Sequence, residues 1–299
     1  MGKNILITGA NGQLGRELQN LIPLYKPFSF FVTDVEVLNL CNKKKVESYI
    51  TKNDINYIVN CAAYTAVDKA EDETMLCYKI NRDAIKILAE AANGKAKVIH
   101  VSTDYVFDGK YNLPYKETHP TNPQSVYGKS KKEGEIILLE RCPESIVIRT
   151  AWLYSVFGNN FVKTMIRLSK NQETINVVSD QIGTPTYAAD LAKAIMDIIV
   201  LSENTQTFAP GVYHYSNIGI CSWYDFCVKI YELANIKTCK VNPIPTSDYP
   251  TKAIRPMHSV LDKTKIKETF NLKIPKWDES LKKCILIMGE REQVVQNHS

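Results

Sequence analysis

The chain has 299 residues, and 44% of them are hydrophobic, which is enough to build a substantial core in an ordinary globular protein. Lysine and arginine exceed aspartate and glutamate by 37 − 32 = 5, a net charge too small and too scattered to indicate nucleic-acid binding. The eight cysteines have neither the Cys-x-x-Cys spacing nor the Cys/His spacing of a zinc site, so we expect free thiols and no metal centre.

No apolar run reaches the length of a membrane span, and Met1 leads almost directly into the first predicted strand, leaving little room for a signal peptide. We therefore expect a cytoplasmic protein with no membrane partner and no nucleic-acid partner.

The first predicted elements are a strand, a glycine-rich turn and a helix. Residues 4–8 are a short apolar run typical of a buried parallel strand, and residues 16–22 have a helical pattern. Between them lie Gly9, Gly12 and Gly15, spaced G-x-x-G-x-x-G. Glycines in this context let the backbone approach a pyrophosphate, which then binds at the helix N-terminus. The alternative is a plain tight turn.

A second predicted strand, residues 28–33, ends at Asp34. An acidic residue about 20 positions after the glycine turn is typical of a carboxylate that binds the adenosine ribose hydroxyls. Such a carboxylate repels the 2′-phosphate of NADPH, so we expect a preference for NADH, which Arg16 would weaken. Asn39 and Leu40 follow, where they can flank the adenine. An ordinary loop is the alternative for all of these positions.

After a helix at residues 46–51, a third strand at residues 57–60 ends in Cys61-Ala62-Ala63-Tyr64. Small residues at the carboxyl end of a parallel strand allow a ligand to approach closely. A helix is then expected from residue 72 to residue 92, ending at an Asn-Gly pair. On this helix, Asn81 is either a core amide or the anchor of a water in a proton relay.

The pair Tyr127 and Lys131 lies four residues apart on the next predicted helix, so both side chains share one face. A lysine ammonium beside a phenol lowers the pKa of the phenol, which can then donate a proton to a carbonyl oxygen. Strands at residues 98–103 and 145–149 flank this helix. Alternating strands and helices predict a Rossmann-like, doubly wound parallel sheet in an NAD(P)-binding domain of residues 1–150.

The second half of the chain mixes segments of both kinds. Helices are expected at residues 161–170, from Asp190, and from the N-cap Ser222 to about residue 234, with strands at 175–178 and 212–215. Residues 151–299 are thus expected to form mainly a smaller, discontinuous substrate-binding domain, with residues of about 186–220 returning to the sheet. His214 and His258 are expected to be structural. Arg255 is either a ligand of a substrate diphosphate or part of a surface ion pair.

Together, these residues resemble the extended short-chain dehydrogenase/reductase family, and within it the reductases of nucleotide-linked 4-keto sugars. The resemblance rests on seven segments that cover nearly the whole chain: residues 8–15, 60–71, 102–109, 127–131, 149–154, 180–186 and 255–256. It implies a catalytic set of Thr103, Tyr127 and Lys131, and sugar contacts from Thr103, Asp104 and Trp152. The implied cofactor contacts are Gly12, Gln13, Leu14, Asp34, Cys61, Ala62, Ala63, Tyr127 and Lys131.

Two positions depart from related sequences. Tyr105 occupies the position of a glutamate that drives water elimination in the related dehydratases, and Asn39 replaces an aspartate near the adenine.

The activity that the resemblance implies is reduction of dTDP-4-dehydro-L-rhamnose to dTDP-L-rhamnose, with hydride from NADH or NADPH and a proton from Tyr127. The alternatives are an epimerase of the same family and a non-catalytic, cofactor-binding regulatory subunit. We expect a monomer or a homodimer, and some members of the family carry Mg²⁺ between subunits.

Overall fold

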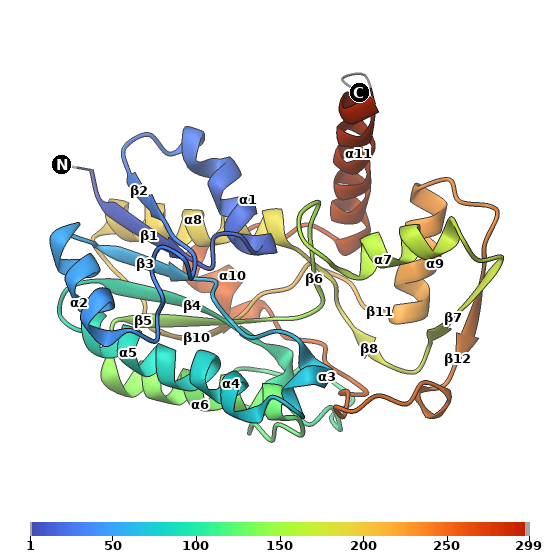
Figure 1. The fold of residues 1–299 in the computed structure, drawn as a ribbon, viewed down its shortest axis with the longest axis horizontal. Coiled ribbons are helices and arrows are strands. Elements are labelled where there is room, and N and C mark those ends of the chain that lie inside the picture. Colours follow the sequence, from blue (N-terminus) through green and yellow to red (C-terminus); the bar gives the residue numbers. More distant parts are fainter. Residues whose placement is uncertain (1, 297–299) are drawn as a thin grey trace.

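The computed structural model describes the backbone of residues 2–296 and side chains as far as residue 291. Its centre is a six-stranded parallel sheet with the order β10-β5-β4-β3-β1-β2 (Figure 1). The strands are β1 (Asn4–Thr8), β2 (Ser29–Val32), β3 (Tyr57–Asn60), β4 (Lys97–Thr103), β5 (Ser145–Thr150) and β10 (Gly211–His214). Five of them lie within the strands predicted from the sequence or differ by one residue at one end, and β10 is shifted by one residue from the predicted 212–215. This agreement confirms the doubly wound class.

Helices cover both faces of this sheet, as Figure 1 shows. One face packs against α1 (Gln13–Leu21), α8 (Ala188–Thr205) and α10 (Thr264–Phe270). The other packs against α2 (Lys43–Lys52), α5 (Ala84–Ala92) and α6 (Val126–Arg141). Side chains alternate between the faces, so that Ile5 and Ile7 join the first core and Leu6 joins the second.

The helix expected over residues 72–92 is found at residues 74–92, but its geometry is not α-helical throughout. The segment is divided into α4 (Thr74–Tyr78), a π-helical turn (Lys79–Asp83) and α5, and a short helix, α3 (Val67–Ala70), precedes it. The buried Asn81 lies in the π turn, where its amide accepts from Tyr64 N at 2.8 Å and donates to Tyr64 O at 3.1 Å. These hydrogen bonds join Asn81 to the loop at Tyr64, at the position where the helix widens into a π turn. Hydrophobic periodicity along the chain does not reveal such a turn.

The remaining elements form a smaller layered unit on the right of Figure 1. Its strand pairs are β6 (Leu153–Tyr154) with β9 (Thr186–Tyr187), β7 (Thr174–Val178) with β12 (Lys240–Ile244), and β8 (Ile182–Gly183) with β11 (Cys221–Ser222). Its helices are α7 (Phe161–Ser169), α9 (Trp223–Leu233) and α11 (Trp277–Gln296). As predicted, Ser222 caps α9, in a capping box with Asp225.

The order of the strands creates a topological switch point, where successive connections move toward opposite edges of the sheet. β1 lies between β2 and β3, and the helices that follow β1 and β3 cover opposite faces of the sheet. Ligands of open α/β sheets bind at such a point, beyond the carboxyl ends of the strands. None of the described helices combines the length and the apolarity needed to cross a membrane.

Candidate active site

The glycine-rich turn after β1 lies against the residues that follow β3. Gly9 has φ +64°, and a Cβ on it would lie 2.6 Å from Ala62 N. A Cβ on Gly15 would lie 2.5 Å from Gly9 O, so α1 meets the turn at a distance that only glycine allows. No described side chain caps the N-terminus of α1, whose first N–H groups remain free to bind an anion.

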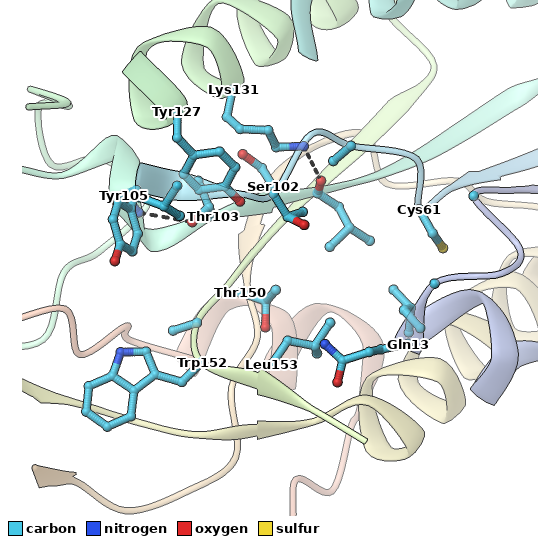
Figure 2. A pocket seen from close by; sticks show the side chains of 18 of the residues that line it. Gln13, Cys61, Ser102, Thr103, Tyr105, Tyr127, Lys131, Thr150, Trp152 and Leu153 are labelled. Atoms are coloured by element: carbon cyan, nitrogen blue, oxygen red, sulfur yellow. Dashed lines mark hydrogen bonds between the residues drawn. The ribbon is translucent and has the colours of Figure 1, made fainter. Parts of the chain in front are cut away.

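A cavity of about 580 Å³ opens at this point. Figure 2 shows its two walls, one carrying Tyr127, Lys131 and Thr103, and the other carrying Gln13, Leu153 and Trp152. The lining contains most of the predicted cofactor, catalytic and sugar-contact residues: Gly9, Gly12, Gln13, Leu14, Gly15, Cys61, Ala63, Thr103, Asp104, Tyr127, Lys131 and Trp152. Residues from five separate segments are thus brought to one cavity. The glycine turn leaves no room for a Cβ, and such a close backbone approach fits a dinucleotide.

Tyr127 and Thr103 lie side by side on one wall of this cavity. Ser125 caps α6 by accepting from Gly128 N at 3.1 Å, which places Tyr127 in the first turn of the helix. The Tyr127 ring packs edge-on against Tyr105, with 5.5 Å between the centroids, and is buried. The Thr103 hydroxyl donates to Asp104 Oδ1 at 3.0 Å and also lies beside the Tyr127 phenol. A carbonyl oxygen between these two hydroxyls would meet two hydrogen-bond donors once the Thr103 hydrogen turns from Asp104 to that oxygen.

The expected lowering of the Tyr127 pKa by Lys131 is not found in this structure. Burial raises the pKa of Tyr127 above its usual value, and the Thr103 hydroxyl only partly opposes this. The Lys131 amino group donates to Val101 O at 2.7 Å and lies 3.1 Å from His100 Nε2. Burial lowers the pKa of Lys131 to about 8. Helical spacing placed the two side chains on one face of α6, but the contacts of β4 decide where the amine lies.

Asp104 and Trp152 lie at the end of the cavity nearest the smaller unit. Burial raises the pKa of Asp104 to about 6, although hydroxyls of Ser259 and Thr103 oppose the shift. Its Oδ2 has no partner at hydrogen-bond geometry among the described residues. Trp152 has φ +48° and stacks on Trp223, with 3.6 Å between the ring centroids. A buried acceptor and a half-buried aromatic ring that line the same cavity are suited to a sugar ring.

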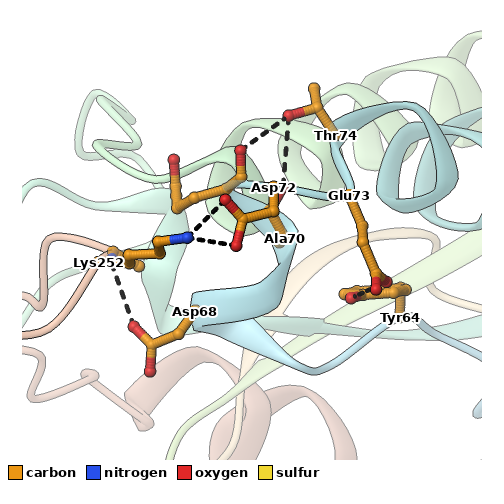
Figure 3. Close-up of polar contacts among 9 residues, drawn as sticks. Tyr64, Asp68, Ala70, Asp72, Glu73, Thr74 and Lys252 are labelled. Atoms are coloured by element: carbon orange, nitrogen blue, oxygen red, sulfur yellow. Dashed lines mark hydrogen bonds and ion pairs between the residues drawn. The ribbon is translucent and has the colours of Figure 1, made fainter.

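Arg255 lies in an ion pair, which was one of its two expected roles. Its Nη2 pairs with Asp68 Oδ2, and its Nη1 donates to Tyr105 OH at 3.2 Å. Nearby, Lys252 pairs with Asp72, as Figure 3 shows. Arg255 also lines a second cavity, of about 460 Å³, that shares Tyr105 with the first.

Five predicted cofactor residues lie outside the lining of the first cavity. Asp34 Oδ2 accepts from Asn11 N at 2.8 Å, so its carboxylate borders the glycine turn, and Arg16 approaches the same Asn11 at 3.4 Å. Leu40 is buried in the core. The others are Asn39, which accepts from Cys41 N, Ala62, which packs against Gly9, and Tyr64, whose hydroxyl donates to Glu73 at 2.6 Å.

The sequence patterns did not place the loop at residues 158–160 in this site. Gly158 has φ +61°, and a Cβ on it would lie 3.0 Å from Gln13 Cγ, so the loop closes over the start of α1. Asn160 Nδ2 donates to Gln13 Oε1 at 3.0 Å. The Gly-Asn-Asn sequence is a turn signal that predicts a loop but not its position.

The two histidines predicted to be structural are His214 and His258. His214 is buried, with Nδ1 3.0 Å from Tyr115 O, and burial lowers its pKa to about 3. No group of three His, Cys, Asp or Glu side chains within the described part of the chain could hold a metal ion.

The doubly wound sheet, with a glycine turn at its switch point and a Tyr-x-x-x-Lys helix beside it, defines the class of extended short-chain dehydrogenases and reductases. More narrowly, the chain belongs to the family described as RmlD substrate binding domain, which matches residues 3–289.

Its relatives are similar over nearly their whole length. The dTDP-4-dehydrorhamnose reductase of Aggregatibacter actinomycetemcomitans is 44% identical over 286 residues, which are 93% of this chain and 97% of that protein. The crystal structure of a dTDP-4-dehydrorhamnose reductase from Clostridium acetobutylicum has a TM-score of 0.90 at 44% identity, covering 96% and 99% of the two chains. That of the Bacillus anthracis enzyme in complex with NADP has a TM-score of 0.88 at 40% identity, covering 96% and 99%.

Proposed function

We propose that this protein is an NAD(P)H-dependent reductase that converts dTDP-4-dehydro-L-rhamnose into dTDP-L-rhamnose. The observation that carries the proposal is the single cavity in which the glycine cradle, Thr103 and Tyr127 meet, in a chain whose relatives named as this reductase match it from end to end. The reaction adds one hydride and one proton to a ketone, so the site needs a hydride donor and a general acid.

The cofactor supplies the hydride when it is bound. The glycine turn and the free N-terminus of α1 would hold its pyrophosphate, and the residues after β3 would lie along it. Tyr127 then donates its proton to the carbonyl oxygen as that oxygen gains charge. Because burial raises the pKa of this phenol, Tyr127 is fully protonated at neutral pH, as a general acid must be. The Thr103 hydroxyl turns its one hydrogen from Asp104 Oδ1 to the same oxygen and fixes its position.

Substrate recognition would fall mainly to residues 151–299, with residues 1–150 holding the cofactor. Asp104 Oδ2 is a free acceptor for a sugar hydroxyl, and the Trp152 ring offers an apolar face. Arg255 would bind the diphosphate, exchanging its partner Asp68 for phosphate oxygens in the adjoining cavity.

The preference between cofactors is proposed to favour NADH modestly. Asp34 borders the glycine turn, where its carboxylate can accept from ribose hydroxyls and repel a 2′-phosphate. Arg16, on the exposed side of α1 and close to Asn11, offsets part of that repulsion. NADPH is therefore expected to serve as a second cofactor.

The test is a panel of nucleotide-linked 4-keto sugars, assayed by the absorbance of NADH and NADPH. We expect reduced cofactor to be consumed with the dTDP-linked 6-deoxy-4-keto sugar of the L-series, with one cofactor oxidised for each ketone reduced. A cofactor that is bound but never consumed with any member of the panel would contradict the proposal.

A further inference from the structure

A row of buried polar side chains runs under the catalytic helix and ends at Lys131. Thr8, Asn60 and His100 are direct neighbours on the adjacent strands β1, β3 and β4. Thr8 Oγ1 is 2.6 Å from Asn60 Oδ1, Asn60 Nδ2 is 2.9 Å from His100 Nδ1, and His100 Nε2 is 3.1 Å from Lys131 Nζ. All four residues are at most 2% exposed. Buried polar groups in one continuous chain restrict one another's orientation.

The orientation of the Asn60 amide follows from its backbone neighbour. Ala62 N–H donates to Asn60 Oδ1 at 3.2 Å, and a backbone N–H can only donate. Thr8 Oγ1 adds a second hydrogen bond to the same oxygen. The NH₂ of Asn60 therefore faces His100, and His100 Nδ1 must be the acceptor.

This fixes the tautomer of His100. Burial holds the pKa of His100 well below its usual value, so the ring is neutral and carries one hydrogen. Since Nδ1 accepts, the hydrogen is on Nε2 and points at Lys131 Nζ. An ammonium would place its own hydrogens against this N–H. An uncharged amine instead accepts from Nε2 and still donates to Val101 O at 2.7 Å.

We propose that Asn60 and His100 are positioning residues that favour the uncharged amine of Lys131, and that Lys131 takes up a proton from solvent when a nicotinamide dinucleotide binds. The inference rests on the proposed function, because it assigns that cofactor to the cavity. The anionic pyrophosphate of a dinucleotide in this cavity favours the ammonium form. The protonated Lys131 is then the group that stabilises charge beside Tyr127.

The other titratable groups around Lys131 are not expected to take up the proton. Cys61 follows β3 and Cys77 lies on α4, and burial raises the pKa of both thiols, so they already hold their protons. Glu135, one turn further along α6, is buried, but its bonds to Arg149 hold its pKa below the usual value. Lys131 itself titrates close to neutral pH, because burial lowers its pKa to about 8.

The first experiment determines the tautomer of His100 by ¹⁵N NMR of the cofactor-free protein, with each of the five histidines assigned by substitution. We expect the proton on Nε2 in the wild type. In Asn60→Asp the new carboxylate still accepts from Ala62 but must also accept from His100, so the proton should move to Nδ1. A wild-type protein with the proton on Nδ1 would overturn the proposal.

The second experiment measures proton uptake on cofactor binding by calorimetry in two buffers of different ionisation enthalpy, at a pH near the Lys131 pKa of about 8. We expect net uptake in the wild type, reduced by about half or more in Asn60→Asp, because the new carboxylate charges Lys131 beforehand. His214→Leu removes a buried imidazole that lies on β10 beside Arg149, and it should leave the uptake unchanged.

Uptake that is equal in the wild type and in Asn60→Asp would overturn the assignment. Cofactor binding without proton uptake would overturn the coupling alone. If the wild-type protein binds neither NADH nor NADPH, the proposed function and this coupling both fail. In activity assays, the alkaline limb of the kcat/KM profile should move to higher pH in Asn60→Asp by about one unit.

Discussion

Arg149 on β5 and Glu135 on α6 form a buried, two-point ion pair. Arg149 Nε donates to Oε1 at 2.9 Å and Nη2 donates to Oε2 at 2.7 Å, with side chains 2% and 0% exposed. Tyr127, Lys131 and Glu135 follow one another at four-residue intervals along α6, and each meets a different polar residue of the sheet. The helix that carries the candidate acid is thus anchored to the sheet by polar contacts.

Glu135→Gln is expected to destabilise the protein by about 3–5 kcal/mol, because Arg149 is left as a buried, unpaired charge. Urea unfolding measures the loss. Glu133→Gln is the matched control on the same helix, since its contact with Arg82 is 3.4 Å long and exposed, and such pairs contribute about 0–1 kcal/mol. Equal losses in the two variants would mean that Arg149 has found another partner.

Tyr127→Phe should lower kcat by about 10²–10⁴ because it removes the general acid while the ring and helix remain. Cofactor affinity, measured by fluorescence titration, should change little. Thr103→Val should cost less than Tyr127→Phe, since it removes one hydrogen bond to the carbonyl oxygen. If Ser102→Ala is more damaging than Thr103→Val, the wrong hydroxyl has been assigned.

Trp152→Ala should raise the KM for the sugar nucleotide and also lower the melting temperature, because the ring both lines the cavity and stacks on Trp223. Gly183→Ala is a milder version of the same test. Its Cβ would lie 2.7 Å from the Trp152 ring and displace it without removing it. A lowered melting temperature with an unchanged KM in both variants would show that Trp152 serves packing alone.

Asp34→Ala should shrink the preference for NADH by weakening NADH and relieving the repulsion of NADPH. We expect a wild-type preference of about tenfold, equivalent to about 1.4 kcal/mol, for a partly solvated contact. The ratio of kcat/KM for the two cofactors measures it. A ratio that does not change would mean that Asp34 only holds Asn11, and Arg16 would then be the next residue to test.

Asp104→Asn should stabilise the cofactor-free protein at neutral pH relative to the wild type. Burial raises the pKa of Asp104 from 3.8 unfolded to about 6 folded, so native protein binds more protons than unfolded protein between these values. Stability is therefore greatest below the unfolded pKa and falls as pH rises through the folded one. Urea unfolding at about pH 4 and about pH 7 should show a gain at the higher pH only, on the order of 3 kcal/mol at most. An equal gain in the free energy of unfolding at both pH values would mean that the buried Asp104 carboxylate does not destabilise the protein at neutral pH.

The local sequence determined the central fold and most of the cavity lining. Short apolar strands, the glycine spacing after β1 and the Tyr127–Lys131 spacing are patterns within a few residues, and the backbone rules behind them act over the same range. Since parallel strands end at one edge of a sheet, the residues that follow different strands are predictably neighbours there, even when they are far apart along the chain.

Only the tertiary structure decided which partner each polar side chain has. Lys131 contacts His100, 31 residues away, and Arg255 pairs with Asp68, 187 residues away. The π turn at Asn81 and the stack of Trp152 on Trp223 likewise depend on distant segments. Burial and hydrogen-bond polarity are properties of the assembled neighbourhood, and they set the protonation of Tyr127, Lys131 and Asp104. The sequence could therefore name these groups, but the packing around them determines their chemistry.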